Sequence, residues 1–359
     1  MAEPQVQKWQ TLEDGLENLT RASGPIPKPG ADEVLVEISA VSLNYRDTEV
    51  IMGMYNHHKT ITDTTEPLVP CSDMCGTVIA VGDGPHTIPW SVGDRVLSTF
   101  IQTHLTGQIK AKDMSYGLGK PLEGSLQTHR VFPSYGLVKA PDYLPDEEAS
   151  CLPIAAVTAW MAINGMRPIG QPGGKGETIL LQGTGGVSVS GLQIAKASGA
   201  TAIITSSSPT KLARAAALGA DHTINYTTTP SWQDSVMSLT GNEGADVILE
   251  CGGAQTLHKS LDCVAFGGLI ACIGYVSGKE DDPAGSRMNL NLLALRRNVT
   301  LKGIINGPRD RFVEMCEFYD KHQIRPVVDR VFGFEEAREA VKYLFGGKHF
   351  GKVVVRVKA

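Results

Sequence analysis

The sequence lacks an excess of positive charge, a long apolar run and an apolar N-terminal leader. Its 359 residues carry 33 lysines and arginines against 38 aspartates and glutamates, a formal net charge of −5. Nucleic acid is therefore not an expected partner, because neutralising phosphates requires a basic face. No apolar run reaches the roughly 18 residues of a membrane span, and the opening MAEPQVQKWQTLEDGL has no secretory h-region. We expect a cytoplasmic protein without a membrane partner.

Cysteine is sparse and follows no pattern. The seven residues are an odd number, and no secretory signal accompanies them, which favours free thiols over a disulfide framework. They stand at positions 71, 75, 151, 251, 263, 272 and 316.

Two organisations follow one another along the chain. Residues 33–84 alternate apolar and polar positions with many β-branched residues, which indicates strands. From about residue 172, short apolar strands alternate with helical segments, which predicts a parallel sheet covered by helices on both faces. After about Gly307 the pattern changes to helix, loop and strand, and we expect this tail to return to the β-rich part. The six expected strands of the middle region are TILLQ, AIITS, HTINY, DVILE, LIACIG and VTLKGI.

The stretch LLQGTGGVSVSG resembles a dinucleotide-binding turn with one glycine replaced. Gly183 and Gly185 hold the first two positions of G-x-G-x-x-G, and Ser188 holds the third. The first two glycines and the following helix N-terminus form the pyrophosphate site, whereas the third permits close helix–strand packing. Serine at this position thus leaves the expected nucleotide site intact. The alternative is a tight turn that binds no ligand.

The second strand of this region indicates which nucleotide binds. An NAD site carries Asp or Glu about 20 residues after the turn, but AIITSSSPTKL contains neither. Ser206, Ser207 and Lys211 offer hydroxyls and a cation, which suit a 2′-phosphate, and Tyr226 ends the next strand. We therefore predict NADPH rather than NADH. Ser-Ser-Ser-Pro-Thr is also a helix-capping sequence, and both functions are compatible.

With these motifs, the chain resembles the medium-chain dehydrogenase/reductase superfamily over nearly its whole length. The resemblance rests on SLNYRDTEVIMGMY, EPLVPCSDMCGTVIAVGDG, VGDRVL, the GTGG turn, GADVILECGG, GGLIACIG and HFGKVVVRV. It implies an α/β protein with a GroES-like catalytic domain and a Rossmann domain. The implied domains are residues 1–152, 153–307 and the returning segment 308–359. It also implies a homodimer, formed by pairing of Rossmann edge strands near VTLKGI.

The resemblance is strongest to the zinc-independent branch of quinone-reductase-like and enoyl-reductase-like proteins. Zinc-dependent relatives place a cysteine where Asn44 stands, a His-Glu pair at Ser72-Asp73, and a third ligand near Ile154. None of these residues makes a good zinc set, and no four-cysteine lobe for a structural zinc is present. We therefore expect no bound metal.

The same resemblance implies the site residues. Asn44 and Thr158 would lie at the nicotinamide or substrate, and Tyr55 of the G-x-Y motif would face the substrate. Asp47 of the same NYRD motif is better explained as a cap or salt-bridge partner than as a catalytic group. The implied cofactor-binding residues are Gly183, Thr184, Gly185, Gly186, Val187, Ser188, Ser206, Ser207, Lys211, Tyr226, Cys251, Gly274, Tyr275, Val276, Phe350 and Gly351.

The predicted activity is NADPH-dependent hydride transfer to a small activated substrate. Without zinc to polarise a carbonyl, the acceptor must already be electrophilic, as in an enone, a quinone or an enoyl thioester. Hydrogen-bond donors would then hold the resulting enolate, and Tyr55 is the candidate donor. Two alternatives remain open: a zinc-free alcohol or ketone oxidoreductase, and an NADPH-binding structural or scaffold protein without turnover.

Overall fold

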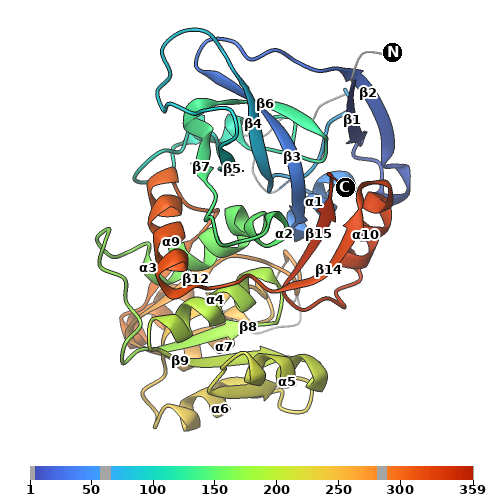
Figure 1. Cartoon of the computed structure of the whole chain (residues 1–359). Helices are drawn as coiled ribbons and strands as arrows, with labels where there is room; N and C mark the ends of the chain where they lie inside the picture. Colours follow the sequence, from blue (N-terminus) through green and yellow to red (C-terminus); the bar gives the residue numbers. More distant parts are fainter. Residues whose placement is uncertain (1–4, 57–65, 281–288, 359) are drawn as a thin grey trace. The chain divides into compact units, whose positions relative to one another are not determined.

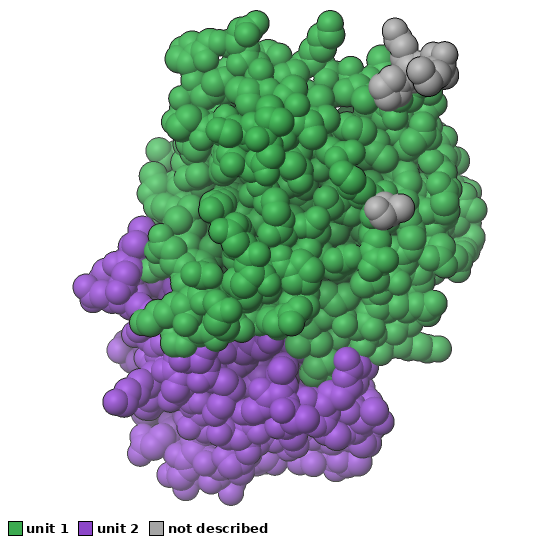
Figure 2. Space-filling view, viewed as in Figure 1, with its two compact units in different colours: residues 1–157, 308–359 green, residues 158–307 purple. Residues whose placement is uncertain are grey.

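The computed structural model describes residues 5–56, 66–280 and 289–358. The chain divides into two compact units, coloured separately in Figure 2: unit 1 is Met1–Val157 with Pro308–Ala359, and unit 2 is Thr158–Gly307. The sequence placed the first boundary after Leu152, whereas residues 153–157 belong to unit 1. Unit 1 is therefore built from both ends of the chain.

Unit 1 is organised around a seven-stranded sheet whose long strand is β3 (Glu33–Leu43). EVLVEISAVSL is rich in β-branched residues and almost entirely buried, which suits a central strand covered on both faces. The C-terminal strand β15 (Lys352–Arg356) pairs antiparallel with β3, with Val354 opposite Ser42 (Figure 1). This pairing places the two ends of the chain in one sheet. The other strands are β14 (Val328–Gly333), β4 (Cys75–Val81), β5 (Arg95–Ser98), β6 (His129–Pro133) and β7 (Leu137–Lys139).

Smaller elements complete unit 1. The strands β1 (Gln5–Gln10) and β2 (Thr20–Pro25) form an antiparallel pair. The α-helices are α1 (Tyr45–Ile51), α2 (Asp146–Ala149), α9 (Arg309–His322) and α10 (Ala337–Phe345). A π-helix, η4 (Leu152–Ala156), leads to the unit boundary. Short 3-10 turns occur at η1 (Leu16–Asn18), η2 (Ala111–Tyr116), η3 (Ser134–Gly136) and η5 (Phe334–Glu336).

Unit 2 is a six-stranded parallel sheet in the order β10-β9-β8-β11-β12-β13. This order reverses direction between β8 and β11, as in doubly wound dinucleotide-binding folds. The strands are β8 (Thr178–Gln182), β9 (Thr201–Ser206), β10 (His222–Asn225), β11 (Ala245–Glu250), β12 (Val264–Cys272) and β13 (Thr300–Gly303). The helices are α3 (Val157–Asn164), α4 (Gly186–Ala197), α5 (Pro209–Ala217), α6 (Trp232–Leu239), α7 (Leu257–Cys263) and α8 (Leu290–Arg297).

The buried strands of unit 2 carry helices on both faces. Leu180 and Ile248 pack with Trp232 and Val236 of α6 in one hydrophobic cluster. The alternate residues Leu181 and Leu249 face α4, since a Cβ atom added at Gly191 of that helix would meet their side chains at 2.8 and 2.9 Å. The predicted α/β class, with a GroES-like and a Rossmann part, is confirmed.

One helix is shorter than its sequence suggested. The segment 256–268 reads as helix, but α7 ends at Cys263 and β12 begins at Val264, which pairs with Ala245 of β11. Val264 is fully buried, so pairing within the sheet core outweighs the helical pattern. No helix in the described part of the chain is long and apolar enough to cross a membrane.

Candidate functional site

The turn after β8 has the geometry of an anion-binding turn. Gly183 has φ of 77°, a left-handed conformation that favours glycine. Gly185 is the N-cap of α4, and a Cβ atom added at either glycine would meet no atom within 4 Å. The two glycines thus leave free space beside the turn, where the first backbone amides of α4 have no intrahelical partner. Thr184 is buried within the turn, and Gly186 and Val187 begin the helix.

Ser188, the residue in place of the third glycine, makes a specific contact. Its hydroxyl is buried and donates a hydrogen bond to the backbone oxygen of Gln182, 2.6 Å away. Its Oγ atom also lies 3.9 Å from the Sγ atom of Cys251. Ser188 therefore connects the start of α4 to the carboxyl ends of β8 and β11.

A buried pair of side chains, Gln182 and Glu250, organises the point where the strand order reverses. The Gln182 amide donates to Glu250 Oε2 over 2.7 Å, and its Oε1 atom accepts from the backbone amides of Cys251 and Gly252. Glu250 also accepts from the amides of Gly252 and Gly253 and from the hydroxyls of Thr256 and Ser260. With its oxygens fully engaged, Glu250 shapes the turn after β11 and is not a free base.

Gln182 and Glu250 were missed from the sequence. Their signal is a polar residue that ends an otherwise apolar strand, in TILLQ and in DVILE.

The segments after β11 and β12 converge on the same edge of the sheet. The backbone amide of Gly274 donates to the backbone oxygen of Glu250 over 3.3 Å. The backbone amide of Val276 donates to the backbone oxygen of Cys251 over 3.2 Å. Between them, the ring of Tyr275 lies 4.8 Å from the Lys279 ammonium. In doubly wound sheets this carboxyl edge, at the reversal point, is where ligands bind.

The residues predicted to select the nucleotide also lie together. Ser206 ends β9 and its backbone oxygen accepts from the amide of Tyr226, 3.2 Å away, so the ends of β9 and β10 meet. Ser208 is the N-cap of α5, and its hydroxyl accepts from the amide of Lys211 over 3.3 Å. Ser207 is exposed between them. The capping function is therefore present, and Ser207, Lys211 and Tyr226 remain at the same edge of the sheet.

Thr158 lies on α3 of unit 2. Its side chain is buried, and its Oγ1 atom accepts a hydrogen bond from the Asn306 amide over 3.3 Å. Asn306 follows β13, so this contact fixes the end of the chain segment that closes unit 2.

In unit 1, the NYRD motif forms the start of α1. The backbone amide of Asn44 donates to Asp47 Oδ2 over 2.8 Å, which caps the helix. The Arg46 guanidinium donates to Asp47 Oδ1 over 3.2 Å. Burial raises the pKa of the Asp47 carboxyl to about 6, although Arg46 and the Asn44 amide act in the opposite direction. Asp47 is thus the cap and salt-bridge partner that the sequence favoured.

Tyr55 is packed rather than open. Only 7% of it is exposed, and it forms a small cluster with Val50 and Leu68. The Arg46 guanidinium lies 4.8 Å from the centre of its ring, a cation–π distance. Arg46 therefore connects Tyr55 to the capped start of α1.

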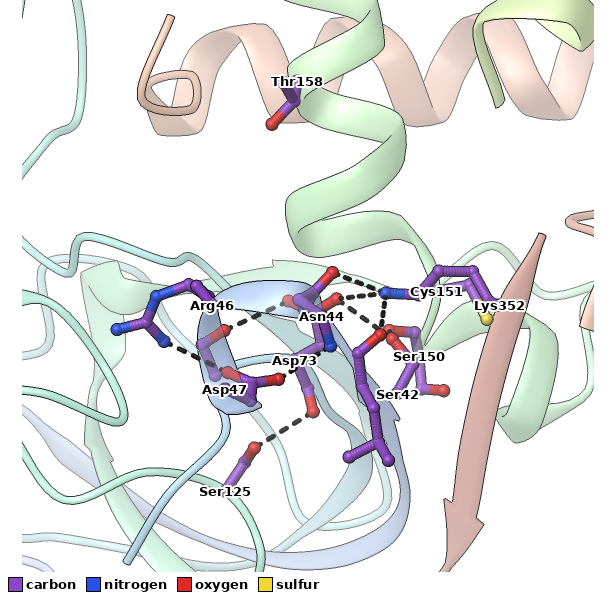
Figure 3. Close-up of polar contacts among 12 residues, drawn as sticks. Ser42, Asn44, Arg46, Asp47, Asp73, Ser125, Ser150, Cys151, Thr158 and Lys352 are labelled. Carbon is purple, nitrogen blue, oxygen red and sulfur yellow. Dashed lines mark hydrogen bonds and ion pairs between the residues drawn. The ribbon is translucent and has the colours of Figure 1, made fainter. Parts of the chain in front are cut away.

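A buried lysine stands beside Asn44 in Figure 3. The Lys352 ammonium donates to the Asn44 Oδ1 atom over 2.6 Å and to the Leu43 backbone oxygen over 2.8 Å. The Oδ2 atom of Asp73 lies 3.4 Å away. Lys352 was missed from the sequence, where its signal is a lone lysine opening the apolar run KVVVRV.

The two residues before Lys352 have structural explanations in unit 1. Phe350 is buried, and Gly351 has φ of 83° with a Cβ position only 2.4 Å from the Val327 oxygen. Glycine is therefore required here by the backbone, whether or not a cofactor binds.

Comparisons with known proteins agree with this geometry. Residues 30–142 match the family described as alcohol dehydrogenase GroES-like domain, and residues 186–321 match zinc-binding dehydrogenase. A zinc-type alcohol dehydrogenase-like protein from Schizosaccharomyces pombe is 37% identical over 96% of both chains. The chain belongs to the medium-chain dehydrogenase/reductase superfamily. The structure of a candidate alcohol dehydrogenase from Sinorhizobium meliloti superposes with a TM-score of 0.86 at 38% identity, covering 99% of this chain and 100% of the other.

Other superfamily members that match have varied names. A quinone oxidoreductase-like protein 2 homolog from Nematostella vectensis is 26% identical over 92% of this chain and 83% of its own. An acryloyl-coenzyme A reductase from Sulfurisphaera tokodaii is 27% identical over 92% and 94%. An NAD-dependent alcohol dehydrogenase superposes with a TM-score of 0.83 at 30% identity over 98% and 99%. A mycobacterial protein in complex with NADPH gives 0.77 at 25% identity over 98% and 100%. The protein is thus an oxidoreductase of this superfamily.

Zinc, which one family description implies, does not fit the described side chains around Lys352 in unit 1. Asn44 and Asp73 both contact the Lys352 ammonium, whose positive charge would repel a dication. Cys151 lies beside this cluster (Figure 3), and burial raises the pKa of its thiol to about 12. Cys71 and Cys75 are buried, and burial raises both thiol pKa values well above the usual range. Among the described residues, no three His, Cys, Asp or Glu side chains are grouped to hold a metal.

Proposed function

We propose that the protein is an NADPH-dependent, zinc-independent reductase of an activated C=C bond or a quinone in a small organic substrate. The observation that carries this proposal is the Lys352 ammonium among Asn44 and Asp73, at positions where zinc-dependent relatives hold their metal. A site without a Lewis acid favours an acceptor that is already electrophilic. The quinone oxidoreductase-like and acryloyl-coenzyme A reductase relatives support this substrate class.

The cofactor preference follows from the edge of the sheet formed by β9 and β10. Ser207 follows β9, Lys211 lies in the first turn of α5 and Tyr226 follows β10, and residues 201–211 contain no Asp or Glu. A cation and hydroxyls suit a 2′-phosphate, which a carboxylate would repel. The mycobacterial relative in complex with NADPH supports this preference, whereas the relative named NAD-dependent makes it a point to test.

The proposed reaction assigns separate functions to the cofactor and to the residues of this chain. When bound, NADPH provides the hydride. The turn from Gly183 to Ser188 would hold its pyrophosphate through backbone amides and the α4 dipole. If hydride bonds to the β-carbon of the acceptor, the C=C π pair would form the new double bond to the carbonyl carbon, and the C=O π pair would move to the oxygen. Tyr55 would donate a hydrogen bond to the enolate oxygen, or it would transfer its proton to the α-carbon, and only this proton transfer yields the saturated carbonyl.

The decisive experiment follows NADPH oxidation by the purified protein with matched enones, quinones, enoyl thioesters, ketones and aldehydes. Reduction of the conjugated acceptors alone supports the proposal, and reduction of unconjugated ketones favours a zinc-free alcohol or ketone oxidoreductase. No turnover together with tight NADPH binding favours a structural or scaffold protein. Elemental analysis of the same sample tests the metal: about one zinc per chain would overturn the zinc-independent assignment.

We also propose that the protein forms a homodimer through the β13 edge of unit 2. β13 ends the strand order, and its described partner is β12 alone. The preceding helix α8 has no buried residue and exposes Leu292 and Leu295, the latter by 78%. An unpaired edge beside an apolar helix is a typical protein–protein surface.

A further inference from the structure

Lys352 is held by three acceptors, two on the adjacent residues Leu43 and Asn44 and one on Asp73. Only 4% of the residue is exposed, and burying an ammonium is costly unless it is paired. Its Nζ atom contacts the Leu43 oxygen, Asn44 Oδ1 and Asp73 Oδ2 at 2.8, 2.6 and 3.4 Å. An ammonium has three hydrogens, so these contacts use all of its donors. Lys352 therefore has no hydrogen left for a substrate and acts through its neighbours.

Asp73, the acidic residue that contacts Lys352, is itself held by two hydrogen bonds. Ser42 donates its hydroxyl to Asp73 Oδ2 over 3.0 Å, and Ser125 donates to the Asp73 backbone oxygen over 3.0 Å (Figure 3). Asp73 is completely buried. Its carboxylate thus balances the charge of Lys352 and limits where the ammonium can lie.

The contact with Lys352 decides the orientation of the Asn44 amide. Only the Oδ1 atom can accept a hydrogen bond from the ammonium, so the NH2 group must occupy the other position of the planar amide. There the Nδ2 atom is buried, and it has no hydrogen-bond partner within the described ranges of the chain. A buried donor without a partner costs about 1–3 kcal/mol. A buried N–H group without a partner is suited to donate a hydrogen bond to an oxygen atom of a bound ligand.

We propose that Lys352 is a positioning residue, which orients and polarises the Asn44 amide so that Nδ2 donates a hydrogen bond to the acceptor oxygen of the substrate. The proposal rests on the proposed function and identifies the substrate class as one carrying an oxygen that gains negative charge during hydride transfer. A cation on Oδ1 draws electron density from the amide and strengthens its N–H donors. The donor is fixed before the reaction, so its contribution grows with the charge on the oxygen. Lys352 thereby supplies, through an amide, part of the positive field that a metal supplies in zinc-dependent relatives.

The test is a double-mutant cycle with Lys352→Met and Asn44→Ala. Because the lysine acts through the amide, each single variant should lower kcat with the best acceptor by ~100-fold, and the double variant should lose less than threefold more. The dissociation constant of NADPH should change by less than about threefold. Lys352→Arg, which keeps the charge, should recover much of the loss. Independent, multiplicative losses in the double variant would overturn the proposal.

A matched control separates positioning from folding. Arg311→Met removes another largely buried cation of unit 1, whose guanidinium lies 2.8 Å from Glu314 on α9. It should lower the melting temperature without a comparable loss in kcat. An equal loss of kcat in Arg311→Met would assign the Lys352 effect to general destabilisation.

A measurement without turnover keeps this proposal separate from the proposed function. The side-chain amide signal of Asn44 in a 15N–1H spectrum is identified by its disappearance in Asn44→Ala. In Lys352→Met the 15N shift of this signal should move upfield, because the amide is no longer polarised by a cation. An unmoved signal would overturn the positioning role even in an active enzyme. A moved signal in a protein that reduces no acceptor would support the positioning while rejecting the proposed function.

Discussion

The hydroxyl of Ser188 donates a hydrogen bond to the backbone oxygen of Gln182, 2.6 Å away. In the G-x-G-x-x-G pattern this position is glycine because the helix must approach the strand closely. Here the close approach is made one turn later, where a Cβ at Gly191 would lie 2.8 Å from the Leu181 side chain. Ser188 has thus exchanged a packing function for a hydrogen bond between α4 and β8.

We expect Ser188→Ala to lower the free energy of unfolding by about 1 kcal/mol, the usual contribution of one hydrogen bond. NADPH affinity should change little, since the backbone amides of the turn remain. Gly191→Val should cost at least twice as much, because its side chain would overlap Leu181 and Leu249. Chemical denaturation of the three proteins measures both effects. A larger loss in Ser188→Ala than in Gly191→Val would contradict this division of functions.

The cofactor preference should depend on Lys211. Removing a charge-assisted hydrogen bond to a 2′-phosphate costs about 1.5–3 kcal/mol, so Lys211→Ala should weaken NADPH binding roughly 10- to 100-fold. NADH lacks this phosphate and should be affected less than about threefold. Fluorescence titration of both cofactors measures the ratio. The control is Lys259→Ala, a lysine on α7 whose ammonium contacts the Pro230 oxygen, which should leave both affinities unchanged. Equal losses for the two cofactors, or tighter NADH binding in the wild type, would reject the NADPH assignment.

The sequence predicts unit 2 well because its signals are local. Each strand is a short apolar run, and Gly199, Gly219 and Gly241 mark helix ends, where the structure gives them φ of 78°, 105° and 63°. The boundary between α7 and β12 was not predictable from the local pattern, since Val264 is fixed by its pairing with Ala245 in the sheet.

The polar site of unit 1 depends on contacts that no local pattern contains. Lys352 and Asn44 are separated by 308 positions and meet only because β15 pairs with β3. The motif NYRD therefore predicted Asn44 and the cap formed by Asp47, but not the cation that orients the Asn44 amide. Likewise, no local motif places Cys151 beside the cluster, where Figure 3 shows it.

The function of Tyr55 can be separated from its packing. Tyr55→Phe keeps the ring that the Arg46 guanidinium contacts and removes the hydroxyl, which also forms a hydrogen bond with Arg46. If the hydroxyl serves the enolate, kcat/KM should fall more than tenfold with little change in NADPH affinity. Tyr343→Phe is the control, since it removes a hydroxyl that donates to Asp329 elsewhere in unit 1. Wild-type turnover in Tyr55→Phe would leave Tyr55 as a packing residue only.

Asp47 should make the stability of unit 1 depend on pH. Its pKa is raised by burial from 3.8 to about 6, so the folded state binds a proton more readily than the unfolded state. Asp47 therefore contributes stability that is fully present below pH about 4 and is lost as the pH rises through about 6. Arg46, Asp73 and Lys352 face this carboxyl and set the final value.

The measurement compares the unfolding free energies of the wild type and Asp47→Asn between pH 4 and 7. The wild-type advantage should decrease by roughly 2–3 kcal/mol over this interval, since one pKa unit corresponds to about 1.4 kcal/mol. Asp146→Asn provides a control of opposite sign, because hydrogen bonds from Arg95 lower the pKa of Asp146 despite burial. The Asp146 contribution should be lost on acidification. A difference between wild type and Asp47→Asn that is constant with pH would contradict the raised pKa.

The β13 edge makes the oligomeric state testable with two substitutions. Leu295→Glu and Leu301→Glu place charges of the same sign on the exposed face of α8 and on β13 itself. If two copies pair at this edge, burying these charges is unfavourable, and light scattering should show the mass of one chain instead of two. Leu239→Glu, an exposed leucine on α6, should leave the mass unchanged. A single-chain mass in the wild type would reject the homodimer. If both substituted proteins remain dimers, the interface must lie on another surface. An apolar edge contact cannot accommodate two unpaired charges per chain.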